Sequence, residues 1–402
     1  MNIQKNILII GAGIAGCSLA HFLAKTGWGV ILLERQDAIA QGGSGNPVAA
    51  IYPKFMLNDK AYNDFMLKSF MFTTAWIKEL NLDKNDYEFN GAIEILDQAY
   101  AHKLDINLSK NILDKKAFLS VINGKILKKY HIDKDAGGLL FHQGGWVNPI
   151  ALCRHLVSHS NIQIVTNQKI TFIEKLNHQW KLETNEKKKF TAHQVAICNA
   201  EYVHQFDLTQ HLHTDVFRGQ INWVNQTSFK MPTIVSCDEG YLAPLIYNKH
   251  IFGATYAMND FEKDIRLSDT KKNIASIKEI HREFYKHCLT QESIRGRVAW
   301  RASTKDRKPY VGRVFNNQLL KKMRVRELAH ADQLPWLEHL YVASGFGSRG
   351  FTFAPYCASV LANLINENLS KEDKETLNYT NPERYRLKKM SLKKVASRIF
   401  QV

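Results

Sequence analysis

The sequence predicts an α/β protein in which a Rossmann-like nucleotide-binding domain is interrupted by inserts that form a smaller α+β domain. Two stretches, 7–34 and 340–365, each run from an apolar segment through a glycine-rich turn into a helical pattern. That order is typical of a strand, a tight turn and a helix in a parallel α/β sheet. Apolar runs of strand length lie between the two stretches and indicate that the chain returns to the same sheet.

The N-terminal stretch has the spacing of a dinucleotide-binding motif. Residues 7–10 are all apolar, residues 11–16 read G-x-G-x-x-G at the start of a helical pattern, and a second apolar run ends at Glu34. The first glycine permits a tight turn, the second lets the backbone approach a pyrophosphate, and the third lets the helix pack on the strand. The helix N-terminus attracts phosphate, and the carboxylate can accept hydrogen bonds from a ribose. A secretory signal peptide, which an apolar run can mimic, does not explain this glycine spacing.

The later patterns set the expected domain boundaries. Strands are expected at 162–165, 170–173, 180–183, 194–198 and 340–343, and within the inserts at 220–224, 241–246 and 250–254. Helices are expected over 272–287 and 355–365. We therefore expect a nucleotide-binding domain of residues 1–85, 140–205 and 325–402, with a basic tail at 384–402, and a substrate domain of residues 86–139 and 206–324.

Two further glycine-rich segments favour FAD over a nicotinamide cofactor. The small-residue loop at 41–47 follows the second strand and can run along an extended cofactor. The turn at 345–350 opens a helix whose N-terminus can face the electron-rich pyrimidine edge of a flavin. Each segment alone is equally consistent with a surface loop or a helix start, so the preference for FAD depends on their combination with the first motif.

Composition limits the classes of protein and partner. In 402 residues, 45% are hydrophobic and 23% are charged, which excludes wholesale disorder. The 54 Lys+Arg against 38 Asp+Glu give a net charge of +16, which favours nucleic acid, an anionic membrane surface or an acidic substrate as partner. The cysteines have neither disulfide-framework nor zinc-ligand spacing, so we expect reduced thiols, no metal and a cytoplasmic location. No apolar stretch approaches the roughly 20 residues of a membrane helix.

Longer motifs in the chain resemble a known flavoprotein family. They are GAGIAG with Glu34, QGGSGNPVAAIYP at 41–53, HQGGWVNP at 142–149, WRASTKDRKPYVG at 300–312 and ASGFGSRGFTFAPYCA at 343–358. They are similar to motifs of the glycine/D-amino-acid oxidase superfamily. More narrowly, they resemble the FAD-dependent domain of the bifunctional tRNA 5-methylaminomethyl-2-thiouridine biosynthesis proteins. The resemblance covers nearly the whole chain and implies a D-amino-acid oxidase/glutathione-reductase-like fold with non-covalently bound FAD.

The resemblance also implies a reaction and a substrate-binding arginine. The family oxidises the carboxymethylaminomethyl group on the wobble uridine of certain tRNAs, which leaves an aminomethyl uridine and releases glyoxylate. In the superfamily, the arginine of an R-x-x-T-x-D-x-x-P-x-x-G pattern pairs with the substrate carboxylate. That pattern maps onto Arg301, Thr304, Asp306, Pro309 and Gly312. A planar guanidinium can hold a carboxylate through two hydrogen bonds and so orient the adjoining carbon. Without the motif, Arg301 would be assigned to a surface ion pair.

The motifs give two sets of candidate site residues. The catalytic candidates are Arg301, Tyr241 and Tyr256; the tyrosines lie near the expected strands of the substrate domain, where aromatic residues more often serve packing. The candidate cofactor-binding residues are Gly11, Gly13, Ile14, Ala15, Gly16, Glu34, Arg35, Gln41, Ser44, Gly45, Asn46, Ile170, Ala200, Gly345, Gly347, Ser348, Arg349 and Gly350.

The excess positive charge gathers in two segments. Residues 295–327 contain eleven Lys/Arg and two acids and overlap the Arg301 motif, and residues 384–402 contain seven Lys/Arg and no acid. We expect the second segment to form a basic, partly amphipathic helix that binds tRNA phosphates. Attachment to an anionic membrane and a merely solvated helix are the alternatives.

The sequence departs from the proteins it resembles in two places. Those proteins carry a methyltransferase domain ahead of the oxidase domain, whereas this chain begins with the nucleotide-binding strand, so we expect the oxidative step alone and a separate methyltransferase acting next. Ala200 stands where the superfamily usually has glycine.

Three other functions remain as alternatives. They are a small-molecule amine oxidase or dehydrogenase for glycine, sarcosine or a D-amino acid, a membrane-associated amino-acid dehydrogenase that reduces quinone, and a nucleic-acid-binding protein with structural FAD. The intact arginine motif disfavours the last of these.

Overall fold

The computed structural model describes residues 5–109, 117–225, 227–291, 294–324, 327–329 and 334–392. The chain divides into two compact units, each assembled from separated segments. Unit 1 comprises Met1–Ser44, Cys153–Val216 and Arg301–Val402, and unit 2 comprises Gly45–Leu152 and Phe217–Trp300. Two of the boundaries fall inside strands, β14 (Asp215–Asn225) and β19 (Arg295–Ser303).

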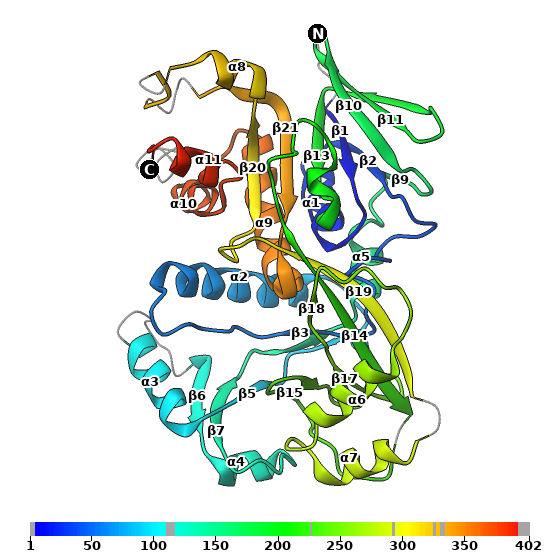
Figure 1. Ribbon diagram of the computed structural model, residues 1–402, viewed down its shortest axis with the longest axis vertical. Helices are drawn as coiled ribbons and strands as arrows, with labels where there is room; N and C mark the ends of the chain where they lie inside the picture. Colours follow the sequence, from blue (N-terminus) through cyan, green and yellow to red (C-terminus); the bar gives the residue numbers. More distant parts are fainter. Residues whose placement is uncertain are drawn as a thin grey trace. The chain divides into compact units, whose positions relative to one another are not determined.

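Unit 1 is built on a largely parallel sheet with the strand order β20-β21-β13-β1-β2-β9 (Figure 1). The parallel strand β1 pairs with both β13 and β2, and β20 runs antiparallel to β21 at one edge. Because the central strands are covered on both faces, their residues are apolar after the first positions of β1 and β13, which are Asn6 and Gln194. The strands are β1 (Asn6–Ile10), β2 (Gly29–Leu33), β9 (Ile162–Val165), β13 (Gln194–Ile197), β20 (Tyr310–Phe315) and β21 (Trp336–Ser344).

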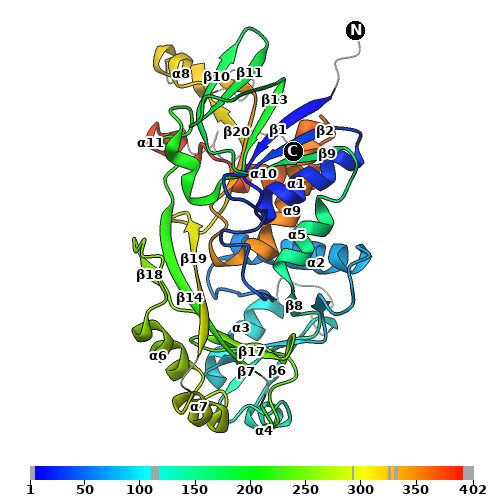
Figure 2. The same cartoon turned by 90° about the vertical axis from the view of Figure 1, so that its right-hand side faces the viewer.

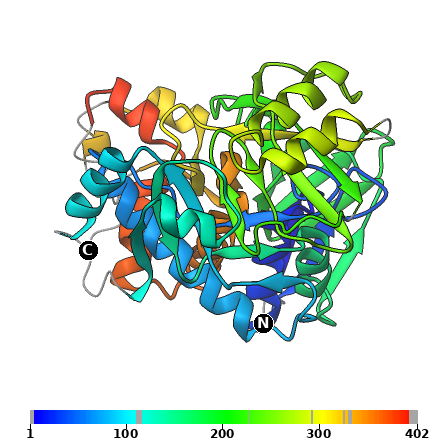
Figure 3. The ribbon, with the colours of Figure 1, turned by 90° about the horizontal axis from the view of Figure 1, so that it is seen from below.

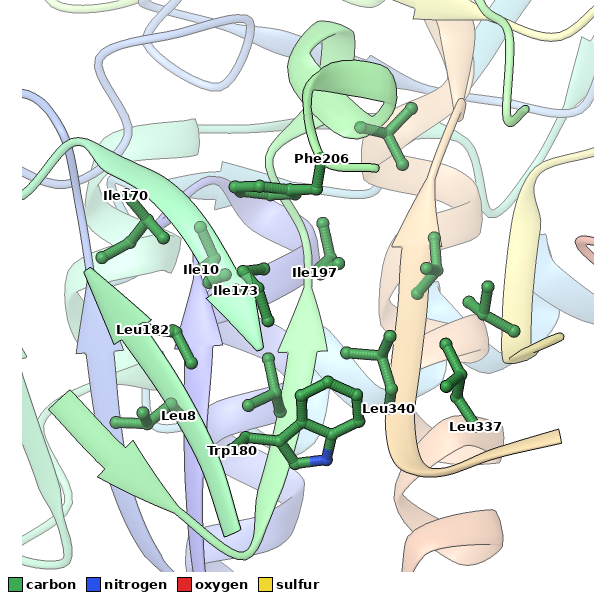
Figure 4. Packing of buried hydrophobic residues seen from close by; sticks show 14 of the residues in the cluster. Leu8, Ile10, Ile170, Ile173, Trp180, Leu182, Ile197, Phe206, Leu337 and Leu340 are labelled. Atoms are coloured by element: carbon green, nitrogen blue, oxygen red, sulfur yellow. The ribbon is translucent and has the colours of Figure 1, made fainter. Parts of the chain in front are cut away.

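Helices cover one face of this sheet and a smaller sheet covers the other. Helices α1 (Ile14–Lys25) and α9 (Gly350–Ile365) lie side by side on the first face (Figure 2). The second face packs against an antiparallel sheet of β10 (Ile170–Leu176), β11 (Gln179–Thr184) and β12 (Lys189–Ala192). Leu8 and Ile10, on the same face of β1, lie with Trp180 and Ile173 in the cluster between the two sheets (Figure 4).

The remaining helices of unit 1 follow the sheet edges and the C-terminal segment. They are η2 (Ala200–Gln205), α8 (Asn317–Lys322), η3 (Glu327–Ala329), η5 (Gly347–Arg349), α10 (Lys371–Thr380) and α11 (Arg384–Lys389). Helix α10 packs on α9 and β20 and begins with a capping box between Ser370 and Asp373.

Unit 2 contains a larger mixed sheet with the strand order β18-β14-β17-β16-β15-β5-β7-β6, and β19 pairs with β14. Helices α6 (Leu267–Ser276) and α7 (Arg282–Leu289), yellow-green in Figure 3, pack against this sheet, where Phe284 meets Phe252. The strands are β5 (Ala92–Leu96), β6 (Leu119–Ile122), β7 (Gly137–Phe141), β15 (Val235–Cys237), β16 (Tyr241–Leu242), β17 (Lys249–Gly253) and β18 (Ala257–Met258).

A short sheet and three helices complete the described part of unit 2. The sheet consists of β3 (Ala49–Ile51), β8 (Gly145–Val147) and β4 (Tyr87–Glu88). The helices are α2 (Lys60–Glu79), α3 (Gln98–Ser109) and α4 (Gly124–Lys129), and α5 (Pro149–Leu156) crosses the boundary into unit 1.

The structure has the predicted α/β architecture, but it divides the chain at different residues from those expected. Residues 45–85 and 140–152 belong to unit 2. There β3 and β4 both pair with β8, which joins segments that are far apart in sequence. Residues 301–324 belong to unit 1 because β20 extends the parallel sheet beside β21.

Two expected helices also differ from the structure. The single helix expected over 272–287 is wrong, because α6 ends at Ser276 and the His281 side chain caps a new helix by accepting from the Phe284 amide at 3.2 Å. The buried residues Ile277 and Ile280 continue the apolar pattern across this break. Helix α9 begins at Gly350, five residues before the expected start, and takes Pro355 into its interior. Residues 393–402 of the expected tail lie outside the described residues.

The close contact between α1 and β1 can be tested with Gly16→Ala. A Cβ atom on residue 16 would lie 1.9 Å from the carbonyl oxygen of Gly11, and backbone there has little room to shift. We expect the free energy of unfolding, measured in urea, to fall by about 2 kcal/mol or more. Gly42→Ala is the matched control, because its Cβ would meet nothing within 4 Å. Equal stabilities for the two variants would contradict the contact.

Candidate functional site

The first glycine-rich turn lies where β1 ends and α1 begins. Gly11 has φ +102°, and a Cβ there would lie 2.6 Å from the carbonyl oxygen of Cys198 at the end of β13. A Cβ on Gly13 would lie 3.2 Å from the Ser44 hydroxyl, which accepts a hydrogen bond from the Ile14 amide at 2.9 Å. The turn is thus a surface of bare backbone at a helix N-terminus, which is the form that a phosphate requires.

Glu34 fixes the adjoining strand end. Its Oε2 accepts from the Ala12 amide at 2.8 Å, and its Oε1 accepts from the Gln36 amide at 2.9 Å. The side chain is buried at the carboxyl end of β2, beside the turn. Both carboxylate oxygens retain lone pairs, so this group can also accept hydrogen bonds from a ribose diol. These groups fit the adenosine and pyrophosphate parts of a dinucleotide.

A second helix N-terminus lies beside the first. Gly345 (φ +76°) and Gly347 (φ +58°) turn the chain out of β21, through η5 and into α9. A Cβ on Gly345 would lie 2.8 Å from the Thr304 methyl group, and one on Gly350 would lie 3.8 Å from the Ile14 side chain. Since Ile14 and Gly350 are the first residues of α1 and α9, the positive ends of both helix dipoles lie at the same edge of the parallel sheet.

Other cofactor candidates have different surroundings. The Arg35 guanidinium lies 3.4 Å from Glu201 and 3.9 Å from the Tyr202 ring centroid. Burial raises the pKa of the Glu201 carboxyl, and Arg35 opposes that shift. The Gln41 side chain is exposed and donates to Asp37 at 2.8 Å. These contacts give Arg35 and Gln41 protein partners within unit 1.

Ile170 and Ala200 lie near the ends of β10 and β13. The Ile170 side chain belongs to the core beneath the parallel sheet, so its backbone alone is left for a ligand contact. Ala200 has φ +51°, a conformation that favours glycine, and its carbonyl accepts from the Ser344 hydroxyl at 2.9 Å. The left-handed backbone explains why glycine suits this position in the superfamily pattern.

Gly45 and Asn46 fall in unit 2. The Asn46 side-chain oxygen accepts from Arg297 on β19 at 2.8 Å. Burial lowers the pKa of the Arg297 guanidinium, so the amide contact partly replaces lost hydration.

The residues of the arginine motif that follow Arg301 have a structural role. Arg301 and Ser303 stand on the same face of β19, and Ser303 forms a β-bridge with Phe346 in the second glycine turn. The Thr304 hydroxyl donates to the Lys308 carbonyl at 2.7 Å and closes the next turn. The arginine strand is therefore fixed to the turn from which α9 begins.

Arg384 holds this motif turn from the C-terminal segment. Its Nη2 and Nε donate to the two oxygens of Asp306 at 2.7 and 2.9 Å, and Nη2 also donates to the Lys308 carbonyl at 2.6 Å. The sequence placed Arg384 in an exposed basic tail, but only 4% of it is accessible. The sequence did not predict that Arg384 pairs with Asp306. The signal that could have indicated such a partner is Asp306 itself, because a buried carboxylate needs a cation.

The two candidate tyrosines lie in unit 2. Tyr241 stands opposite Cys237 on β15 and Gly253 on β17, and Cys237 in turn stands opposite Glu94 on β5. Glu94 is buried and lies 3.4 Å from Lys54, and no pattern in the sequence had marked either residue. Tyr256 is 56% exposed and stacks on Phe217 with ring centroids 4.2 Å apart. Tyr241 is the first residue of β16, whereas Tyr256 lies between β17 and β18.

Neither a candidate metal centre nor a helix able to cross a membrane occurs among the described residues. Within the ranges given above, no three His, Cys, Asp or Glu side chains gather in a way that could hold a metal ion. Among the described helices, none combines the length and apolar character needed to cross a bilayer.

Comparison with known proteins identifies the class. Residues 6–364 match the family model described as FAD dependent oxidoreductase. The chain belongs to this family, which confirms the predicted flavoenzyme class and FAD as its cofactor. It is similar to proteins named tRNA 5-methylaminomethyl-2-thiouridine biosynthesis bifunctional protein MnmC. The identity is 31% for that of Methylobacillus flagellatus and 30% for that of Pseudomonas syringae, in both cases over 96% of this chain. The chain spans about 60% of the length of these relatives.

Solved structures with the same fold support the predicted architecture. Glycine oxidase from Bacillus cereus has a TM-score of 0.72 at 18% identity, covering 92% of this chain and 97% of that one. L-proline dehydrogenase from P. horikoshii has a TM-score of 0.74 at 16% identity, covering 96% and 99%. At these identities the likeness concerns the fold alone, and it confirms the predicted oxidase-type architecture.

The Asp306–Arg384 pair gives acid-dependent stability. Burial alone would raise the pKa of Asp306, but the hydrogen bonds and charge of Arg384 outweigh it and lower the pKa from 3.8 to about 2. The ionised carboxylate therefore stabilises the fold above pH ~4, and this contribution is lost as the pH falls towards 2.

We expect Asp306→Asn to remove that pH dependence. The free energy of unfolding of the wild type, measured in urea, should fall relative to the variant by about 2 kcal/mol between pH 4 and 2. Glu279→Gln, at a half-exposed carboxylate on the surface of unit 2, is the control. A constant difference between wild type and Asp306→Asn across this range would show that the pair does not act in this way.

Proposed function

We propose that this chain uses FAD to oxidise the carboxymethylaminomethyl group on the wobble (2-thio)uridine of tRNA. The products are an aminomethyl uridine and glyoxylate. The observation that carries this proposal is the similarity over 96% of the chain to proteins named for tRNA 5-methylaminomethyl-2-thiouridine biosynthesis. The Arg301 motif and the paired helix N-termini are the features of this chain that suit the reaction.

In this proposal unit 1 holds the cofactor and unit 2 supplies the substrate domain. Glu34 would accept hydrogen bonds from the adenosine ribose, and the glycine-rich turn at the start of α1 would hold the pyrophosphate. The turn at 345–350 and the N-terminus of α9 would hold the flavin part of FAD, because the positive end of a helix favours the negative charge that a reduced flavin carries. When bound, FAD supplies the two-electron acceptor for oxidation of the substrate C–N bond.

Arg301 orients the reacting fragment. That fragment is a glycine attached to the base through its nitrogen, so its carboxylate can form two parallel hydrogen bonds with the guanidinium. Ser303, two residues along the same face of β19, is bridged to Phe346, so Arg301 extends from a strand fixed beside the second glycine turn. Loss of two electrons and two protons from the CH–NH group gives an imine, and water hydrolyses it to glyoxylate and the free aminomethyl group.

A small-molecule amine oxidase is the second candidate. The fold of glycine oxidase extends over 92% of this chain, and a free amino acid would use the same arginine. Purified flavoprotein mixed anaerobically with carboxymethylaminomethyl-bearing tRNA, glycine, sarcosine or D-alanine separates the two candidates. Bleaching of the flavin absorbance by the tRNA alone supports the tRNA reaction, and bleaching by a free amino acid at low concentration overturns it.

The role of Arg301 is tested by Arg301→Met. We expect the variant to retain FAD and to lose about a hundredfold or more in kcat/KM for the modified tRNA, because the carboxylate is no longer fixed. Arg301→Lys should recover part of the loss, since an ammonium supplies charge without the planar fork. Arg295→Met, at the exposed start of the same strand, is the control. Loss of FAD from Arg301→Met would place this arginine in the cofactor site instead.

We also propose that a methyltransferase acts next on the aminomethyl product. The exposed primary amine left on the uridine is a nucleophile that an S-adenosylmethionine-dependent enzyme can methylate, whether that enzyme is a domain or another protein.

A further inference from the structure

Exposed cations lie on three parts of unit 1 that contact one another. The parts are the motif turn at 305–308, the end of α8 with the residue pair after it, and the end of α11. We call them the α8–α11 basic cluster. Its exposed members are Lys305, Arg307, Lys321, Lys322, Arg324, Lys388 and Lys389.

Buried contacts bring these parts together. Arg384 at the start of α11 pairs with Asp306 in the motif turn, and Arg386 donates to the Asn317 side chain at the start of α8 at 2.8 Å. Beneath them, Leu387 of α11 packs with Leu320 of α8 in a small core that also contains Phe315. The three parts are therefore held together by these contacts, although they lie far apart in sequence.

The same contacts pair two acidic groups of the region with arginines. Asp306 is paired with Arg384, and the fully buried Glu383 carboxylate accepts from His211 at 2.8 Å and lies 3.2 Å from Arg386. The described residues of 305–324, 327–329 and 383–392 contain three acids, Asp306, Glu327 and Glu383, and the Glu327 carboxylate accepts from the Arg324 amide at 2.7 Å. The seven exposed cations thus outnumber the acids of the region, and such an excess of like charge is repulsive unless an external anion balances it.

We propose that the α8–α11 basic cluster binds the phosphate backbone of the tRNA substrate; this rests on the function proposed above. A free amino acid offers one carboxylate, for which Arg301 suffices. A folded RNA offers a regular series of phosphates, for which several separately anchored cations are suited. Lys305 lies four residues beyond Arg301, so the cluster begins on the segment that carries the substrate arginine.

The arrangement also corrects the predicted role of the tail. Arg384 does not face an RNA but acts as a positioning residue that holds α11 against the motif turn. Lys388 and Lys389 at the end of α11 are the members of that segment left for phosphates within the described residues. Removal of the whole segment would therefore damage the fold before it reported on tRNA binding.

The chain offers a matched control. Helices α4, α8 and α11 each end in two adjacent exposed lysines, Lys128–Lys129, Lys321–Lys322 and Lys388–Lys389. Each pair has the same favourable interaction with a helix C-terminus. Since α4 lies in unit 2, outside the cluster, it separates a specific surface from general positive charge.

The experiment compares three double variants of the FAD-bound protein. They are Lys321→Gln/Lys322→Gln, Lys388→Gln/Lys389→Gln and Lys128→Gln/Lys129→Gln. Affinity for unmodified tRNA is measured between 50 and 200 mM KCl. We expect each of the first two variants to bind about tenfold more weakly at 0.1 M salt and to reduce the slope of log K against log salt by roughly 1 to 2, and the α4 variant to match the wild type. Flavin content and urea unfolding verify that each variant is folded.

Three results would overturn the inference. They are an unchanged slope in both cluster variants, an equal loss in the α4 variant, and unchanged tRNA binding accompanied by lost binding to phosphatidylglycerol vesicles, which would assign the cluster to a membrane surface. The proposed reaction is judged separately. If modified tRNA fails to bleach the wild-type flavin, the reaction fails whatever the slope; if bleaching succeeds and the slope is unchanged, the surface alone fails.

Discussion

Glycine at positions 11 and 16 is the constraint on which the cofactor region of unit 1 depends. With no side chain at either residue, α1 approaches β1 until the Cβ position of residue 16 lies 1.9 Å from a backbone oxygen. That approach sets α1 against the sheet and leaves its first amides at the strand ends. Helix α9 packs on α1, so its own N-terminus is brought to the same edge. A dinucleotide with two phosphates and an electron-accepting ring suits an edge with two positive helix ends.

The parts of the site that were predictable from sequence are those encoded locally. The first turn and Glu34 lie within one βαβ unit, where spacing alone determines the geometry. The second turn follows a recognisable apolar strand, and its glycines adopt the positive φ angles that such a turn needs. In both turns, the glycine spacing in the sequence matches the positions where the backbone needs a positive φ angle or a close approach.

Contacts between distant segments were not predictable in this way. Asp306 and Arg384 are separated by 78 residues, and Asn46 and Arg297 by 251. A carboxylate in a motif indicates that some cation is needed, but any of 54 Lys and Arg could supply it. Similarly, the apolar pattern of 272–287 continues through Ile277 and Ile280, which are buried without being helical. Periodicity reports burial, and only the capping by His281 shows where the helix restarts.

The position of Arg384 near the end of the chain determines when the turn after Arg301 can gain its buried ion pair during synthesis. The ribosome synthesises β19 and the turn after it before Arg384, which binds that turn. Arg384 follows only after β21, α9 and α10. During synthesis, the Asp306 carboxylate therefore lacks its Arg384 partner until the chain has been extended to α11. Because Asp306 and Arg384 are far apart in sequence, the entropy lost in closing this contact is larger than for a local turn, and the contact ties the turn after Arg301 to the C-terminal segment of unit 1. A chain interrupted before residue 384 would keep the residues of both glycine turns and lack the guanidinium that pairs with Asp306 in the turn after Arg301.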